Sequence, residues 1–492
     1  MSKSSLVLAI DIGTSSCRSA LFDEEGQRVD GTFFQNSYQL QTNREGAAEL
    51  DPTTLVHRLE SCLKQTLNQP LPDQAVIEGI GTSCFWHSML GVDELGQAAS
   101  PIYTWADARC ANEAADLRKH HDEADYHAAT GCMLRPSFWP ARLRWLAKSQ
   151  SGTASNIAHW WSPAEFIQSK FCDEVTVSRS MASGTGLLDV DDPYWHDESL
   201  QMAGITPEHL SPIDDTSLPL SAAIRRKYPA LAEARWFPGI GDGAASNLGS
   251  GATRPGVAAL NFGTSGALRI VLSDQKKVEV PNGLFHYRID DQRRIIGGAI
   301  SNAGNAREWC IENLALPNDP VTLEQAIADT PPLQHGLTVL PFLNPERSPT
   351  WNEQVTGTIT GLRMHNNAIE IYTAICESTY QRMARILDLL RPLAGRKTPK
   401  IMVGGGVQKS PALLQRLGDA LGAPVYPNEE REASMRGAAV FALEHLGKTI
   451  PDVTADITPI KPRPKFAKAF AHQREDLVRL EELLNNTPPF GS

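Results

Sequence analysis

The chain has 492 residues, 41% of them apolar and 21% charged, a composition that excludes a mainly disordered or fibrous protein and allows a large core. At about 100–200 residues per domain, its length predicts two to four domains, with two large ones plausible. The 46 Lys and Arg residues against 57 Asp and Glu residues give a net charge of −11. This argues against a general binder of nucleic acids or membrane surfaces, which are polyanionic. No apolar run approaches the roughly 20 residues that span a bilayer, and the eight cysteines form no CxxC pair, so a cytoplasmic protein is expected.

The first informative segment is a predicted β-hairpin. Two apolar, β-prone runs, 6–10 and 17–22, flank the polar turn 13–16. The same design returns at 257–272, where residues 261–265 (NFGTS) align with residues 11–15 (DIGTS), an offset of 250. So long a period indicates duplicated domains rather than a solenoid, whose periods are about 20–50 residues. The Gly-, Ala- and Ser-rich stretch 245–256 marks the expected boundary, which gives domains 1–250 and 251–450 and a tail, 451–492.

A third glycine-rich loop comes late in the chain. A short strand, 400–403, precedes Gly404-Gly405-Gly406, and Ser410 is the predicted N-cap of a helix over 412–421 that stops at Gly422. A strand at 424–426 follows. Such a unit can direct backbone N–H groups and a helix N-terminus at an anion or a nucleotide.

Three further helices are predicted from their apolar spacing: 368–390, 433–446 and 473–484. The basic, proline-rich tail that holds the last of them is expected to be a solvated strap on the surface. The His- and Asp-rich run 120–127 matches no standard metal-site spacing and is interpreted as a polar helix face.

The chemistry is expected at the three glycine turns and at Asp242, an isolated carboxylate among small residues. Each turn alone would be an ordinary tight turn. Two repeated turns with free hydroxyl and N–H groups can hold phosphates from both sides of a cleft. An Asp beside small residues lets a substrate hydroxyl approach closely, as phosphoryl transfer requires of its base.

In their order along the chain, these motifs resemble those of the FGGY carbohydrate kinases, members of the actin/hexokinase/Hsp70 superfamily. Residues 11–16 and 263–266 resemble the two phosphate motifs, 241–243 the catalytic-base motif, and 404–406 with Ser410 the adenosine motif. Stretches 136–145 and 357–377 are similar to the family's two signatures, except that Arg142 stands where Lys is usual. The resemblance implies an α/β fold with two actin-like (ribonuclease H-like) domains flanking a deep cleft.

Within the family, residues 84–90 (CFWHSML) and 104–109 (TWADAR) are most similar to gluconokinases. This implies transfer of the γ-phosphoryl of ATP to the 6-hydroxyl of D-gluconate, giving 6-phosphogluconate, with ATP and Mg²⁺ as the groups required. Xylulokinase or another sugar or polyol kinase stays open, as does a nucleotide-gated binding protein in the manner of actin or Hsp70. Neither nucleic acid nor membrane is an expected partner, and a homodimer is left open.

The resemblance also implies residue roles. Asp242 would accept the hydroxyl proton and touch the sugar, and Asp11 would position Mg²⁺. Arg109 is a candidate for the gluconate carboxylate, with an ion pair to Asp107 or Asp116 as the alternative. The residues expected at the nucleotide are Gly13, Thr14, Ser15, Ser16, Gly263, Thr264, Gly404, Gly405, Gly406 and Ser410; those at the sugar are His87, Trp105, Asp107 and Arg109, of which Trp105 could instead be a core residue.

Overall fold

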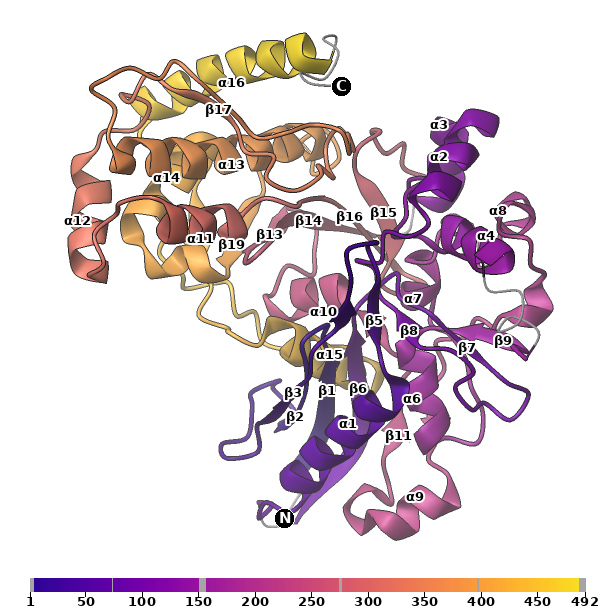
Figure 1. Ribbon diagram of the computed structural model, residues 1–492. Coiled ribbons are helices and arrows are strands. Elements are labelled where there is room, and N and C mark those ends of the chain that lie inside the picture. Colours follow the sequence, from indigo (N-terminus) through magenta and orange to yellow (C-terminus); the bar gives the residue numbers. More distant parts are fainter. Residues whose placement is uncertain (1–3, 73, 150–155, 274–276, 396–397, 486–492) are drawn as a thin grey trace.

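The computed structural model describes residues 4–72, 74–149, 156–273, 277–395 and 398–485. Its architecture is mixed α/β, with two large sheets that lie apart from one another and carry helices on their faces (Figure 1). Within the described residues, no helix is both long and apolar enough to cross a membrane. All eight cysteines belong to the described part and are buried and unpaired.

The first sheet has the strand order β10-β11-β6-β1-β2-β3, with β12 added beside β6. The predicted N-terminal hairpin is confirmed, because β1 and β2 pair antiparallel with Asp11 opposite Arg18. Strands β1, β11 and β12 each run parallel to β6. The strands are β1 (Ser4–Ile12), β2 (Ser16–Phe22), β3 (Phe34–Ser37), β6 (Ala75–Cys84), β10 (Leu218–Pro219), β11 (Arg235–Trp236) and β12 (Ile240–Gly241).

Helices cover both faces of this sheet, which explains why residues 6–10 of β1 are all apolar and buried rather than alternating. Helix α1 (Pro52–Leu67), capped by Asp51, meets β2 where Thr66 and Ser19 share a hydrogen bond of 2.7 Å. Helix α15 (Ala433–His445) matches the predicted helix and covers β1 and β6. Its backbone comes so close to β6 that a Cβ on Gly81 would lie 2.0 Å from the carbonyl oxygen of Ala438.

The second sheet has the order β15-β16-β14-β13-β19-β20. The repeated hairpin is confirmed as β13 and β14, and β13 runs parallel to β19 with Asn261 opposite Gly404. Helix α13 (Ala368–Leu390) has the predicted bounds, and α14 (Pro411–Leu421) is capped by Ser410 and ends at left-handed Gly422. The strands are β13 (Val257–Phe262), β14 (Gly266–Ser273), β15 (Phe285–Arg288), β16 (Arg293–Ile300), β19 (Lys400–Gly404) and β20 (Val425–Pro427).

The prediction for the tail was wrong in part. Helix α16 spans Pro464–Asn485, so it starts well before residue 473, and it lies along α13 rather than as a solvated strap (Figure 1). Phe470 and Leu477 are buried, and Glu481 pairs with Arg382 and Arg385 of α13 at 2.6 Å each. Lysines interleaved with the apolar residues of its first turns conceal this buried stripe in the sequence.

Two main hydrophobic cores follow the two sheets. The predicted boundary near residue 250 falls between β12 and β13, yet α15 returns to the core of the first sheet. The division into domains 1–250 and 251–450 stays a prediction. The other helices are α2 (Ala111–His120), α3 (Glu123–Thr130), α4 (Trp139–Ser149), α6 (Pro163–Phe171), α7 (Arg179–Ser183), α8 (Asp197–Ala203), α9 (Ala222–Lys227), α10 (Asp242–Gly249), α11 (Gly304–Asn313) and α12 (Pro320–Asp329).

Small sheets complete the fold. They pair β4 (Gln41–Thr42), β5 (Ala48–Leu50) and β8 (Ile102–Tyr103); β7 (Leu90–Val92) and β9 (His159–Trp161); and β17 (Thr338–Leu340) and β18 (Thr358–Thr360). The run 120–127 is divided between the end of α2 and the start of α3. Among the described residues, no group of three or more His, Cys, Asp or Glu could hold a metal ion.

Candidate active site

Two carboxylates stand at the same edge of the first sheet. Strand β6 lies between β1 and β12, and its Ser83 and Cys84 are in register with Asp11 and Gly241. Asp242 follows directly as the first residue of α10. In open α/β sheets, ligands bind outside the carboxyl ends of the strands, so both carboxylates occupy the edge where a substrate is expected.

Burial raises the pKa of both of these carboxyl groups. It raises the pKa of Asp242 above its ordinary value of 3.8, an effect that the Arg269 charge opposes and the Asp11 charge reinforces. Burial also raises the pKa of Asp11, against the influence of Arg18, whose Nη1 donates to Asp11 Oδ2 over 2.8 Å. A carboxylate with a raised pKa holds a proton more readily, which suits a general base.

The first predicted phosphate turn, residues 13–16, is fixed by hydrogen bonds at Gly13, while the next two residues reach the surface. The Gly13 N–H donates to the Ser16 carbonyl over 2.9 Å, and the Tyr38 hydroxyl donates to the Gly13 carbonyl. Thr14 is partly exposed and Ser15 is exposed, so their hydroxyl groups can reach a ligand. The predicted role of this turn in holding phosphate is therefore sterically open.

The second turn and the third loop share one cavity. The Gly263 N–H donates to the Ser265 carbonyl over 3.0 Å, while the Gly304 N–H donates to the Gly263 carbonyl over 2.8 Å and ties the turn to α11. A cavity of about 130 Å³ opens between this turn, α11, α13 and the third loop. Its lining includes Gly263, Thr264, Arg307, Glu308, Thr379, Tyr380, Gly406 and Val407.

The third loop needs glycine at its centre. Gly405 has a φ of +92°, and a Cβ there would lie 2.6 Å from the carbonyl oxygen of Phe262. Gly405 and Gly406 are exposed. Ser410 has its hydroxyl engaged, because it accepts from the Leu413 N–H over 3.2 Å and donates to Glu324 over 2.5 Å. Its predicted contact with a nucleotide stays a prediction.

His87 is a neutral histidine in a strained backbone position. Its φ of +66° is rare for a residue with a Cβ, and burial lowers its pKa to about 4. Nδ1 lies 2.5 Å from the carbonyl oxygen of Gly184, which only accepts hydrogen bonds, so Nδ1 carries the proton. Nε2 is then an acceptor, which can receive a hydrogen bond from a sugar hydroxyl.

Arg142, the departure from the family pattern, holds this region together. Its guanidinium is fully buried and donates to the carbonyl oxygens of His87, Tyr103, Thr104 and Pro136 at 2.9–3.3 Å. Four acceptors need the planar fork of arginine, because lysine has only three donors on one nitrogen.

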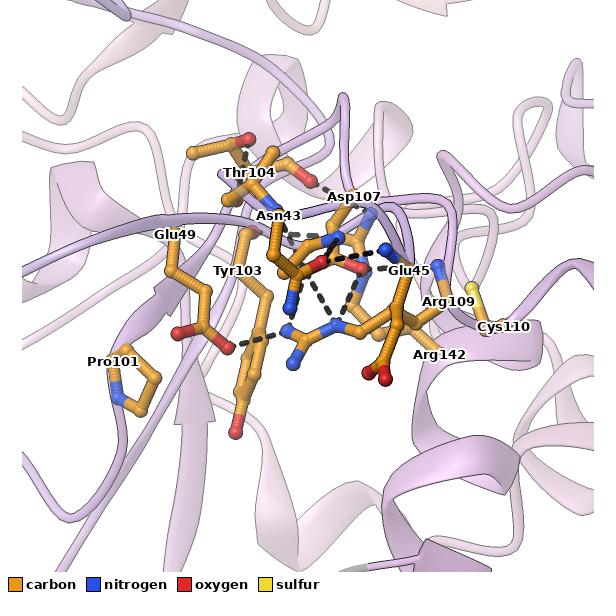
Figure 2. A network of polar contacts seen from close by, with 12 residues as sticks. Asn43, Glu45, Glu49, Pro101, Tyr103, Thr104, Asp107, Arg109, Cys110 and Arg142 are labelled. Carbon is orange, nitrogen blue, oxygen red and sulfur yellow. Dashed lines mark hydrogen bonds and ion pairs between the residues drawn. The ribbon is translucent and has the colours of Figure 1, made fainter. Parts of the chain in front are cut away.

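Arg109 lies in an ion-pair network (Figure 2). Nη2 donates to Asp107 over 2.6 Å and to Glu49, and the guanidinium lies over the Trp145 ring, 4.5 Å from its centroid. Asp107 is 2% exposed and also accepts from the Ala48 N–H over 3.2 Å. The alternative left open by the sequence, an ion pair with Asp107, is thus present, and sugar contacts of either residue stay predictions.

Trp105 contacts Arg347, a residue that the sequence did not single out. Its backbone N–H donates to Ser88 Oγ over 3.0 Å, and its partly buried ring has the Arg347 guanidinium 5.6 Å from its centroid. Arg269, which acts on Asp242, was missed as well. A charged residue within the apolar strand 266–273 could have signalled Arg269, whereas Arg347 lies in a loop without any motif.

The comparisons with known proteins agree with this geometry. Residues 6–226 match the N-terminal domain, and residues 258–444 the C-terminal domain, of the FGGY family of carbohydrate kinases. A gluconokinase of Bacillus subtilis (strain 168) is 27% identical over 505 residues, which cover 98% of this chain and 96% of the relative. A xylulose kinase of Staphylococcus xylosus is 24% identical and covers 89% of this chain and 90% of its own.

Solved structures confirm the predicted fold class. A gluconate kinase from Lactobacillus acidophilus has a TM-score of 0.90 at 23% identity, with 99% of each chain covered. Plasmodium falciparum glycerol kinase with ADP has a TM-score of 0.85 at 18% identity, covering 97% of this chain and 98% of its own. The fold is that of these sugar kinases. Together with the two domain matches, this establishes that the chain belongs to the FGGY family of carbohydrate kinases, which are ATP-dependent phosphotransferases.

Proposed function

We propose that the protein transfers the γ-phosphoryl of ATP to the 6-hydroxyl of D-gluconate. The observation that carries the proposal is the position of Asp242, a buried carboxylate with a raised pKa at the start of α10, one strand away from Asp11. A hydroxyl placed against Asp242 loses its proton as it attacks phosphorus. Gluconokinases at 27% and 26% identity, one from Bacillus subtilis and one from Bacillus licheniformis, support gluconate as the acceptor.

Other residues of the chain would bind the phosphates, the acceptor and the nucleotide. The exposed turn around Thr14 and Ser15 would donate to phosphate oxygens. The Gly263 backbone and Thr264 would steady the transferring phosphoryl, where negative charge builds. The neutral His87 would accept from an acceptor hydroxyl through Nε2, and the small cavity beside Thr264 and Gly406 would receive part of the nucleotide.

Asp11 fits a magnesium ion that arrives with ATP. Mg²⁺ commonly keeps several waters and takes one or two carboxylates plus substrate phosphates, so a single buried carboxylate beside a phosphate turn suffices. Bound there, the ion would neutralise charge on the phosphate oxygens. Arg18 pairs with Asp11 at 2.8 Å and with Glu432 at 3.3 Å, so Asp11 would have to divide its contacts between Arg18 and the ion.

A coupled ATP-consumption assay over several acceptors tests the proposal. Gluconate is expected to give the highest kcat/KM among gluconate, xylulose, glycerol, ribulose and erythritol, and the product is expected to carry phosphate on carbon 6. A clear preference for xylulose would instead support the xylulokinase alternative, which relatives at 23–24% identity keep open. Turnover with none of these acceptors would contradict both.

A further inference from the structure

Two arginines of the C-terminal half face the residues expected at the acceptor. Arg269 on β14 lies beside the first turn of α10, where a Cβ on Gly243 would come within 3.0 Å of its Nε. Its Nε and Nη1 are buried and have no hydrogen-bond partner among the described residues. Arg347, in the loop after β17, reaches the Trp105 ring of the N-terminal half, 5.6 Å from the ring centroid.

Arg269 and Arg347 differ in the carboxylate that acts most strongly on each of them. Arg269 opposes the burial effect on Asp242 more than any other charge does, and Asp242 is the carboxylate that acts most on Arg269. The carboxylate that acts most on Arg347 is its neighbour Glu346, which already pairs with Arg382 at 3.3 Å. No ion pair of Arg347 itself is found in the described part of the chain.

The Arg347 side chain is nevertheless fixed in place. Its Nε lies 3.3 Å from Ser301 Oγ, and its Nη2 donates to the Ile300 carbonyl over 3.1 Å. These two bonds leave the donors of Nη1 unused. The side chain is partly buried, so an anion at its free donors would reduce the electrostatic cost of holding the charge there, and Arg269 nearby adds like-charge repulsion.

We propose, resting on the function proposed above, that Arg347 binds the carboxylate of the acceptor and so selects a sugar acid over a neutral sugar or polyol. The acceptor then lies with its reacting hydroxyl at Asp242 and its acid end against Arg347 and Trp105. Arginine matches a carboxylate through parallel N–H bonds and is the usual residue for this task.

The position of Arg347 distinguishes this role from two others. Arg109, the candidate from the sequence, already holds Glu49 and Asp107, so a substrate carboxylate would have to displace an existing partner. A clamp on the transferring phosphoryl would sit closest to Asp242, and that place is taken by Arg269. The charge of Arg347 acts on His87, on the side of the predicted sugar residues, and Glu346 influences Arg347 more than Asp242 does.

Binding measurements with gluconate and its neutral isostere gluconamide test the proposal by calorimetry. The wild-type protein is expected to bind gluconate more tightly than gluconamide. Arg347→Gln should weaken gluconate by about 10- to 100-fold, the loss of a charged hydrogen-bonded pair, and gluconamide by less than about threefold. Arg347→Lys, which keeps the charge but not the fork, should fall between the two and serves if the Gln variant does not fold.

Two further variants provide comparisons. Arg226→Gln removes an exposed charge on α9 and should leave both dissociation constants unchanged. Arg109→Gln should weaken gluconate and gluconamide in equal proportion, since its ion pairs hold the fold of that loop. A selective loss of gluconate in Arg109→Gln, with Arg347→Gln still discriminating, would overturn the proposal.

The remaining outcomes also decide. Equal weakening of both ligands by Arg347→Gln, or unchanged binding with a lowered kcat, assigns Arg347 to structure or to the phosphoryl group and overturns the inference. Failure of the proposed function is separate, because it appears in the wild-type protein as absent phosphorylation of gluconate. The inference alone fails when the wild-type protein phosphorylates gluconate and Arg347 variants keep the preference for the acid.

Discussion

At Asp242, burial and the charge of Arg269 shift the pKa in opposite directions. Burial favours the protonated acid, while Arg269 favours the ionised form. The result is a carboxyl group with a raised pKa that Arg269 keeps from rising further. Nearby, His87 stays neutral because burial lowers its pKa to about 4. One site thus holds a carboxylate that can take a proton and an imidazole whose Nε2 can accept a hydrogen bond.

Asp242→Asn removes the proton acceptor and keeps the shape of the side chain. The variant is expected to bind ADP as the wild-type protein does and to lose about 10²- to 10⁴-fold in kcat, the usual contribution of a general base. In the wild-type protein, activity should fall as pH drops through the raised pKa of Asp242, because protonation removes the base. The acid limb of kcat/KM should therefore lie above pH 3.8. A near-normal rate in Asp242→Asn would remove this residue from the mechanism.

Helix α15 connects residues far apart in sequence into one element of the site. It crosses α10 so closely that a Cβ on Gly437 would lie 1.7 Å from the Ala245 carbonyl oxygen, and one on Gly249 would lie 1.8 Å from that of Ala433. Asp242 is the first residue of α10. The direction of its side chain therefore depends on a helix that follows it by nearly 200 residues in the chain.

Two glycine-to-alanine substitutions distinguish the effect of this close helix crossing on stability from the effect of helix propensity. Gly437→Ala should lower the free energy of unfolding by about 1–3 kcal/mol through overpacking and reduce kcat, because α10 must shift. Gly418→Ala on α14 is the matched control: its new Cβ would lie 3.6 Å from the nearest atom, an ordinary contact, and alanine favours a helix. Denaturant unfolding and steady-state kinetics measure both. Equal stability of the two variants would contradict a close crossing.

Across the whole molecule, the two sheets contribute unlike parts of the site. The first carries Asp11, Asp242 and, on the loops beyond it, His87 and Trp105. The second carries the cavity beside Thr264 and Gly406, together with Arg269. Arg347 belongs to the second half yet reaches Trp105 in the first. A sugar acid bound as proposed would therefore touch both halves of the chain.

Binding of acceptor and nucleotide should consequently be coupled. Gluconate at saturation is expected to tighten ADP binding by at least about fivefold, the lower end of common coupling free energies, because it holds both halves in one arrangement. ADP must tighten gluconate binding by the same factor. Calorimetric titration of each ligand with and without the other measures this coupling, and gluconamide serves as the comparison ligand. Independent binding of ADP and gluconate would contradict the whole-molecule arrangement.

The local pattern of the sequence was sufficient for the two hairpins and for helices α13, α14 and α15. Apolar, β-prone runs on either side of a polar turn predicted both hairpins, and cap residues such as Ser410 and Gly422 predicted the ends of α14, since these signals act over a few residues. The family motifs predicted the carbohydrate kinase fold. The position of α15 on the first sheet and the buried side of α16 could not be predicted, because both depend on contacts between distant segments.

The candidate site likewise contains residues that the sequence predicted and residues whose contacts only the structure shows. Asp11, Asp242 and the glycine turns could be found from the sequence, because their chemistry requires particular residue types beside one another. Only the tertiary structure decided that Arg109 is held by Asp107 and Glu49 and that Arg347 lies against Trp105. Whether an arginine has a counter-ion depends on which charges the folded chain brings within a few ångströms, and spacing along the sequence does not record that.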